Sequence, residues 1–256
     1  MKIDLNCDMG ESVGDCDMGN DAELMRHISS ASIACGFHAG DPIVMRKTIE
    51  LALDHGVSIG AHPSYPDLQG FGRREMNMSS KEVHDIVLDQ ISAIKGVCED
   101  LGTRLYHVKP HGALYNKAAR CSITAEAIVD AVASIDSNLI VFGLADGELT
   151  RSARKKGLKA AEEGFSDRRY EPDGSLTPRS DPHALISDPQ EAARQTLKMA
   201  VGESIDTRDG QQIKIAADTI CIHGDGKNAL QIAVAIRSLL SESGIEVASI
   251  SVNKIS

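Results

Sequence analysis

The sequence has no tryptophan, and only four phenylalanines and four tyrosines occur among its 256 residues. It also lacks a basic stripe: lysine and arginine are dispersed and the net charge is −10, so we expect no binding to nucleic acid or to an acidic membrane. No apolar run reaches the roughly 20 residues that a membrane-spanning helix requires. Because no apolar signal region precedes the first predicted strand, we expect a cytoplasmic protein.

Three common catalytic or nucleotide-binding motifs are absent. There is no Gly-x-x-x-x-Gly-Lys-Ser/Thr loop, no Gly-x-Gly-x-x-Gly fingerprint and no Gly-x-Ser-x-Gly elbow, so any nucleotide site is not of the P-loop kind. Cys-x-x-Cys pairs and zinc-finger spacings are missing as well. We therefore expect all six cysteines to be free and structural, as is usual for a cytoplasmic protein.

What the sequence does contain is a series of six short apolar runs, each followed at once by polar residues. The first run, 3–5, leads into three such residues, and the runs at 33–35, 57–59, 105–108, 164–165 and 220–222 repeat the pattern. The polar residues are Asn6, Asp8, Glu11, His38, Asp41, His62, Lys109, His111, Asp167, Arg168, His223 and Asp225. Because (β/α) barrels collect their active-site residues at the carboxyl ends of the strands, this pattern predicts one shared site.

Helix-length amphipathic stretches separate the apolar runs. We predict helices at 43–55, 81–101, 122–133, 148–156, 188–201 and 227–243, and a closing or edge strand at 246–252. This alternation predicts a single α/β domain over residues 1–256 with about seven β-α units. An open doubly wound sheet would draw its site from only a few strands, so the pattern favours a barrel. Residues 63–78 and 166–189 are expected to cover the barrel mouth, and 202–217 to form a hairpin about Asp209–Gly210.

The polar clusters permit two kinds of chemistry. Asp8, His38 and His62 could bind a divalent metal, although no local ligand spacing such as His-x-His is present. Lys109 could bind an anion or act as a base, and His111 beside it could exchange protons near neutral pH. Arg73 and Arg168, one on each long loop, could hold a carboxylate or a phosphate between their guanidinium groups.

Six sequence strings resemble those of the LamB/YcsF family. They are DLNCDMGE, ASIACGFHAGDP, GVSIGAHPSYPDLQGFGRR, VKPHGALYN, EGFSDRRY and ICIHGD, in the expected order between Asp4 and Asp225. The resemblance implies a distorted seven-stranded β/α barrel similar to those of polysaccharide deacetylases and certain glycosidases. It also implies functional residues at the matching positions, which are Asp8, Glu11, His38, His62, Lys109, His111, Asp167, Arg168, His223 and Asp225.

The activity implied by the resemblance is ATP-dependent opening of 5-oxo-L-proline to L-glutamate, performed by an A-type chain together with subunits B and C. ATP, with Mg²⁺, is then a co-substrate, and its site lies either on this chain or on a partner. Two alternatives remain: a metal-dependent deacetylase or amidohydrolase acting without ATP, and a non-catalytic scaffold. A homo-oligomer is compatible with the sequence.

Roles within the site are a hypothesis. Lys109 and Arg168 would hold carboxylate or phosphoryl oxygens, His111 or His38 would activate water, and Asp8 would orient that base. The catalytic set is therefore Asp8, His38, Lys109 and His111. The remaining candidates are assigned to binding substrate or nucleotide, and they are Asn6, Glu11, His62, Arg73, Asp167, Arg168, His223 and Asp225.

Overall fold

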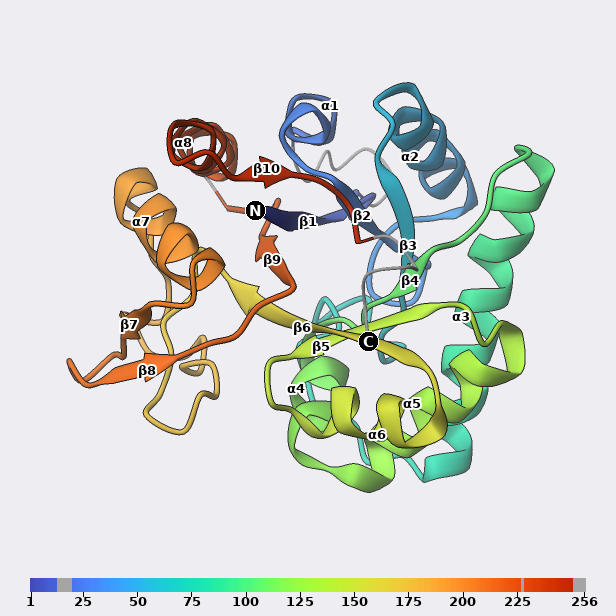
Figure 1. Ribbon diagram of the computed structural model, residues 1–256. Helices are drawn as coiled ribbons and strands as arrows, with labels where there is room; N and C mark the ends of the chain where they lie inside the picture. Colours follow the sequence, from blue (N-terminus) through green and yellow to red (C-terminus); the bar gives the residue numbers. More distant parts are fainter. Residues whose placement is uncertain (13–19, 227, 251–256) are drawn as a thin grey trace.

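Seven parallel strands close into a barrel in the computed structural model, which describes residues 1–12, 20–226 and 228–250 (Figure 1). The strands are β1 (Lys2–Met9), β2 (Ser30–Ala34), β3 (Ser58–His62), β4 (His107–Val108), β5 (Ile140–Leu144), β6 (Lys159–Phe165) and β9 (Thr219–Ile222). Neighbours pair in chain order from β1 to β6, and β9 pairs with both β6 and β1. That last pairing closes the sheet, which confirms the seven-stranded barrel.

Helices surround the barrel (Figure 1). They are α1 (Asp21–Leu24), the 3₁₀ helix η1 (Met25–His27), α2 (Pro42–Asp54), α3 (Ser80–Asp100), α4 (Gly112–Arg120), α5 (Ser122–Ile135), α6 (Glu148–Lys156), α7 (Pro189–Ala200) and α8 (Ala229–Glu242). Their ends follow local chemistry: the Asp41 carboxylate accepts from two backbone N–H groups at the start of α2, and Gly157 ends α6 in the left-handed region. Six of these helices were predicted, whereas α1, η1 and α4 were not.

The remaining elements lie outside the barrel. Strands β7 (Ser204–Asp206) and β8 (Gln212–Lys214) form an antiparallel hairpin, as predicted. The strand predicted at 246–252 is an edge strand and is shorter than predicted. It is β10 (Glu246–Val247), which pairs with β1 over two residues outside the barrel that β9 closes, and 251–252 lie outside the described residues. Five cysteines are free, while Cys16 lies outside the described part of the chain. None of the described helices is long and apolar enough to cross a membrane.

The barrel interior is unusually polar. Along β1, Asp4, Asn6 and Asp8 alternate with residues of the main hydrophobic core, so that one face of the strand is polar and buried. Asn6 lies within hydrogen-bond distance of Lys109, which follows β4 on the opposite side of the barrel. Because a bond between strands that are not neighbours must cross the interior, these side chains point inward and build the site from within.

Glycine at position 60 is required by the packing of this interior. A Cβ atom there would lie 2.0 Å from Nε2 of His107, whose ring stacks on Phe142 at 4.2 Å and contacts Ser32 Oγ at 3.1 Å. We expect Gly60→Ala to lower the free energy of unfolding by about 1–3 kcal/mol through overpacking. Gly96→Ala is the control, because its Cβ would meet open space on helix α3, and it should raise stability by about 0.5–1 kcal/mol.

Urea unfolding of the two variants and the wild type measures this difference. A Gly60→Ala variant as stable as the wild type would show that the His107 ring moves aside at no cost.

Candidate active site

A cavity of about 1150 Å³ opens at the carboxyl ends of the barrel strands. Its wall includes Asp8, His62, Lys109, His111, Phe165 and His223, which stand at or just beyond the ends of five strands. Both long loops contribute to it as well, through Arg73 from 63–78 and Arg168 from 166–188. The prediction that these loops lie over the barrel mouth is therefore confirmed.

Lys109 is buried at the base of this cavity and its ammonium group is fully occupied by protein partners. Nζ lies 2.6 Å from Asp8 Oδ1, 2.8 Å from Asn6 Oδ1 and 3.1 Å from Glu163 Oε1. The Cys221 sulfur is 3.1 Å away. Burial by itself lowers the pKa of Lys109, but the negative charges around it, first that of Asp8, outweigh burial and hold the pKa well above its usual range.

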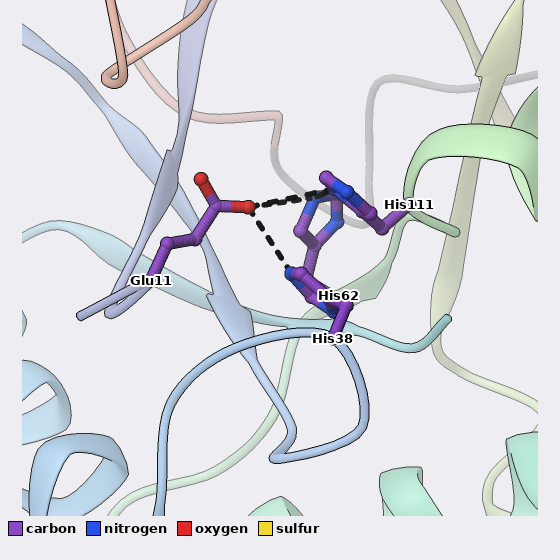
Figure 2. A group of neighbouring side chains, drawn as sticks. All are labelled: Glu11, His38, His62 and His111. Carbon is purple, nitrogen blue, oxygen red and sulfur yellow. Dashed lines mark hydrogen bonds and ion pairs between the residues drawn. The ribbon is translucent and has the colours of Figure 1, made fainter. Parts of the chain in front are cut away.

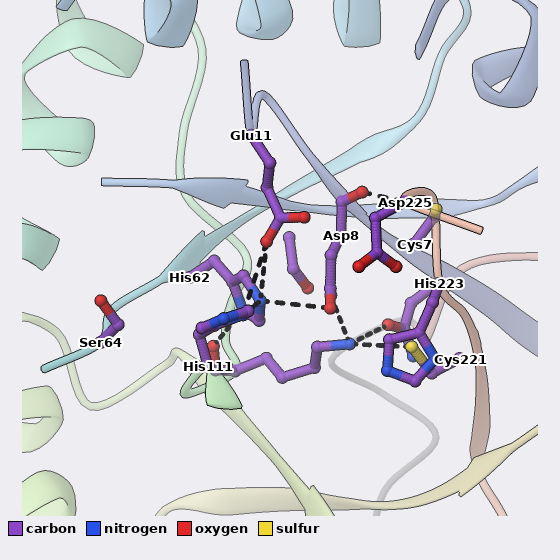
Figure 3. A network of polar contacts seen from close by, with 12 residues as sticks. Cys7, Asp8, Glu11, His62, Ser64, His111, Cys221, His223 and Asp225 are labelled. Atoms are coloured by element: carbon purple, nitrogen blue, oxygen red, sulfur yellow. Dashed lines mark hydrogen bonds and ion pairs between the residues drawn. The ribbon is translucent and has the colours of Figure 1, made fainter. Parts of the chain in front are cut away.

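Asp8 lies between Lys109 and a group of histidines. Figure 3 shows Asp8 together with His62 and His111. Its second oxygen, Oδ2, lies 3.3 Å from His62 Nε2. Burial alone would raise the pKa of Asp8, but the charges of His62 and Lys109 are stronger and hold it well below its usual range. Asp8 is therefore an ionised carboxylate at the cavity wall, held between two cationic or proton-bearing groups.

Four buried side chains meet beside Asp8, and we call them the Glu–His cluster: Glu11, His38, His62 and His111 (Figure 2). The rings of His38 and His111 stack with centroids 3.9 Å apart, and Glu11 Oε1 lies 3.1 Å from His38 Nε2. Burial, together with the neighbouring histidines, lowers the pKa of His38 and of His111 well below the usual range. Burial and the Asp8 charge raise the pKa of Glu11.

Two further ion pairs lie at the site. His223 Nδ1 is 2.8 Å from Asp167 Oδ1, and Arg73 Nη2 is 2.5 Å from Asp225 Oδ2. The first pair joins the residues that follow β6 and β9, and the second joins the loop 63–78 to the residues that follow β9, so both hold loops and strand ends together. The pKa of Asp225 is lowered, because His223 and Arg73 together outweigh the opposing effect of burial.

Arg168 is buried in the cavity wall without a carboxylate partner among the described residues. Its Nη2 donates to the carbonyl of Thr177 at 2.6 Å, while Nε has no hydrogen-bond partner in that part of the chain. Burial and the nearby charge of Arg179 lower the pKa of Arg168 to about 10. By contrast, Arg169 next to it forms an ion pair with Glu191, away from the cavity.

The predicted site residues thus fall into two groups. Those that line the cavity are Asp8, His62, Arg73, Lys109, His111, Arg168 and His223. Those that lie behind it and contact the first group are Asn6, Glu11, His38, Asp167 and Asp225. The structure does not bring together the predicted metal-binding set of Asp8, His38 and His62 alone. His38 and His62 lie with Glu11 and His111, whereas Asp8 lies against Lys109.

Two residues of the site were not predicted. Glu163, on β6, is fully buried, and its Oε2 has no hydrogen-bond partner among the described residues. Tyr115, on the unpredicted helix α4, lines the cavity, and burial together with the Glu163 charge raises the pKa of its phenol. Glu163 could have been found from sequence, because it stands two residues before Phe165 on the inward face of the strand.

Comparison with known proteins identifies the family. The model of the LamB/YcsF family matches residues 3–254. The chain belongs to the LamB/YcsF family. One similar curated protein is the A subunit of 5-oxoprolinase from Tolumonas auensis. It is 50% identical to this chain, and the match covers 96% of this chain and 98% of that protein. The protein of the same name from Bacillus subtilis is 50% identical, with 98% of this chain and 97% of that one covered.

Solved structures agree with this assignment. The lactam utilization protein of Thermus thermophilus has a TM-score of 0.92 and 46% identity, covering 98% of this LamB/YcsF chain and 100% of the other. A putative cellobiose-phosphate cleavage protein from Enterococcus faecalis has a TM-score of 0.56 at 12% identity, with 97% of each chain covered. The second likeness shows the fold alone.

Proposed function

We propose that this chain is the A subunit of an ATP-dependent 5-oxoprolinase, which hydrolyses 5-oxo-L-proline to L-glutamate together with subunits B and C. The observation that carries the proposal is identity of about 50%, over nearly the whole of both chains, to curated proteins of that name. A cavity with buried acid, base and guanidinium groups supports it. The deacetylase alternative is not favoured, because these relatives carry a different activity in their name.

The reaction needs ATP because a five-membered lactam is a stabilised amide. Transfer of the γ-phosphoryl group to the lactam oxygen removes amide resonance and makes the ring carbonyl carbon electrophilic. Water then adds to that carbon, the carbon–nitrogen bond breaks, and the nitrogen takes up a proton. The acyl phosphate that results releases phosphate to a second water, which gives glutamate. ATP with Mg²⁺ is the co-substrate, and the cytoplasm, where ATP is abundant, is the expected compartment.

Arg168 is the group that binds the substrate's anionic oxygens. A buried guanidinium in the cavity wall, whose Nε–H has no partner among the described residues, offers a strong donor to a carboxylate or phosphoryl oxygen. Lys109 suits this task less well, since its ammonium group already donates to Asn6 Oδ1, Glu163 Oε1 and Cys221 Sγ and forms an ion pair with Asp8. Lys109 is therefore a positioning residue, which holds Asp8 and supplies positive charge beneath the substrate.

Asp8 orients the base that takes the proton of the attacking water. Its pKa is held well below the usual range and its two oxygens lie against Lys109 and His62, so the proton acceptor is the imidazole of His62 in the cavity wall. His62 and His111 line the same wall and can pass protons toward the leaving nitrogen. His38 has no exposed surface and lies behind them, so its role is to support the other two rings.

Glutamate formation from 5-oxo-L-proline tests the proposed function. The purified chain is assayed alone, with subunits B and C, and with both plus Mg²⁺–ATP. We expect glutamate only in the last mixture, with one ATP consumed for each glutamate formed. Glutamate made by the chain alone, or acetate released by it from N-acetylated sugars without ATP, would contradict the proposal.

A further inference from the structure

The cavity is larger than 5-oxo-L-proline requires. Its volume of about 1150 Å³ exceeds the range of roughly 300–1,000 Å³ that usually holds a drug-sized ligand. A five-membered lactam with one carboxylate is much smaller than such a ligand. A lactam bound against Asp8, His62 and Arg168 therefore leaves most of the cavity free for a second group.

The outer part of the cavity lies between two walls. Residues 171–176 and 178–180 of the second long loop and 213–215 of the hairpin β7–β8 form one wall. Helices α4 and α6, which Figure 1 shows apart from that hairpin, form the other wall through Gly112 and Gly147 at their N-terminal ends. Neither helix begins with a side-chain cap, so the positive end of each helix dipole favours an anion there.

The cavity lining is cationic, although the chain as a whole is acidic. Seven lysine or arginine and four aspartate or glutamate side chains line the cavity, whereas the net charge of the chain is −10. Four of the seven cations form ion pairs, and they are Arg73, Lys109, Arg120 and Arg151. The other three have no carboxylate partner in the part of the chain that the structure describes, and they are Arg168, Arg179 and Lys214.

Two of these unpaired cations, Arg168 and Arg179, act on each other. After burial, the charge of Arg179 is the largest cause of the lowered pKa of Arg168. Arg168 is only 5% exposed, and its Nε finds no hydrogen-bond partner among the described residues. Two guanidinium groups that repel each other in a cavity wall raise the free energy of the empty site, and an anion between them removes that repulsion. The pair is therefore arranged to receive an anionic ligand.

The charge of the pair suits a phosphoryl group. Such a group carries about −1.5 to −2 charges at pH 7 and three acceptor oxygens, and arginine binds it through parallel N–H donors. The carboxylate of 5-oxo-L-proline carries a single charge, which Arg168 balances alone. Because a guanidinium offers several N–H donors in a fixed fork, Arg168 can hold that carboxylate and one phosphoryl oxygen together. Arg179 then supplies the second guanidinium.

We infer that the outer part of the cavity is a phosphoryl-binding site, in which Arg179 and Arg168 hold the phosphoryl oxygens. Lys214 adds positive charge on the same wall, and the N-terminal ends of α4 and α6 face it from the other. The inference rests on the proposed function for the source of the group. That source is either ATP held on this chain or a phosphoryl group already transferred to the lactam, and both present the same anion.

Phosphate binding to the purified chain tests the inference without lactam or partner subunits, so its failure is distinct from failure of the proposed function. Inorganic phosphate and Mg²⁺–ATP are titrated separately into the wild type and the variants, and binding is measured by calorimetry. We expect the wild type to bind phosphate at one site. Arg179→Gln should weaken that binding by about 10–100-fold, which is the effect of losing one charge-assisted hydrogen bond.

Arg194→Gln is the matched control. Arg194, on helix α7, is exposed like Arg179 and also has no carboxylate partner among the described residues, but it does not line the cavity. Its substitution changes the net charge by the same amount. The phosphate affinity of Arg194→Gln should stay within about twofold of the wild type, because distant exposed charges are screened by salt. Circular dichroism verifies that both variants are folded.

The two titrations distinguish the sources of the phosphoryl group. ATP binding that Arg179→Gln weakens would place the nucleotide on this chain. Phosphate binding that Arg179→Gln weakens, with no binding of ATP, would indicate a phosphoryl group that arrives on the lactam. A wild type that binds neither ligand would overturn the inference. So would equal affinities of Arg179→Gln and the wild type, or equal losses in Arg179→Gln and Arg194→Gln, which would indicate an effect of net charge alone.

Discussion

Lys109→Met is expected to lower kcat for glutamate formation in the complete, ATP-supplied complex by about 10³-fold. The ammonium group holds Asp8 at 2.6 Å and supplies positive charge that compensates the buried carboxylates nearest to it, so its loss removes both orientation and electrostatic stabilisation. Because its hydrogens are used by protein oxygens, KM for 5-oxo-L-proline should change much less than kcat. Steady-state kinetics of the variant separates the two constants.

Loss of stability is the competing explanation for such a result. Removing one partner from a buried ion pair typically costs about 3–5 kcal/mol, because Asp8 and Glu163 would be left uncompensated. Adding Glu163→Gln to Lys109→Met should restore part of the free energy of unfolding while leaving kcat low. Lys155→Met is the control, since its ion pair with Glu126 is exposed. Near-normal turnover by the Lys109→Met variant would show that Lys109 does not have the proposed role in the reaction.

Arg168→Gln is expected to have the opposite kinetic pattern, with KM for 5-oxo-L-proline raised about 100-fold and kcat changed less. A charge-assisted hydrogen bond from a buried guanidinium is worth about 1.5–3 kcal/mol, and about 2.8 kcal/mol corresponds to about 100-fold in affinity. Its unpartnered Nε and its place in the cavity wall make Arg168 the anchor for the substrate's anion. The measurement is the dependence of the glutamate formation rate on 5-oxo-L-proline concentration.

Arg169→Gln is a closely matched control. The residue is the next in sequence and on the same loop, but its guanidinium pairs with Glu191 on helix α7 and does not line the cavity. Its KM should remain within about twofold of the wild type, since a partly exposed ion pair contributes little. Equal effects of the two substitutions would indicate that Arg168 acts only by ordering the loop.

Much of the fold could be predicted because local sequence patterns mark where its helices and strands begin and end. Capping residues such as Asp41 and Gly157 located the six predicted helices to within two residues, whereas most of the strands differ by three to five residues from the apolar runs that indicated them. Helix α4 was missed because it follows Lys109-Pro110-His111 directly, begins at Gly112 without a side-chain cap, and has only nine residues, too few for helix propensity alone to make it stable. Its buried face, which includes Tyr115, forms through packing.

The grouping of the site residues depended on the barrel. The sequence places Asp8 and His38 at neighbouring strand ends. It does not show that Glu11, three residues after Asp8, lies past the end of β1 and contacts His38. Nor does it indicate that Lys109 reaches Glu163 on β6. Such contacts depend on the order in which strands close around the barrel, and strand pairing is not encoded in any local window.

By itself, then, the amino-acid sequence determined the strand ends, the barrel and the family, because periodicity and long motifs are local properties of the chain. Tertiary structure alone decided which polar residues face the cavity, which lie behind it, and which of them form ion pairs. That division has a physical reason. Residue type and spacing set what a side chain can do, whereas burial, distance and hydrogen-bond direction, which only packing supplies, set its charge, its partner and hence its role.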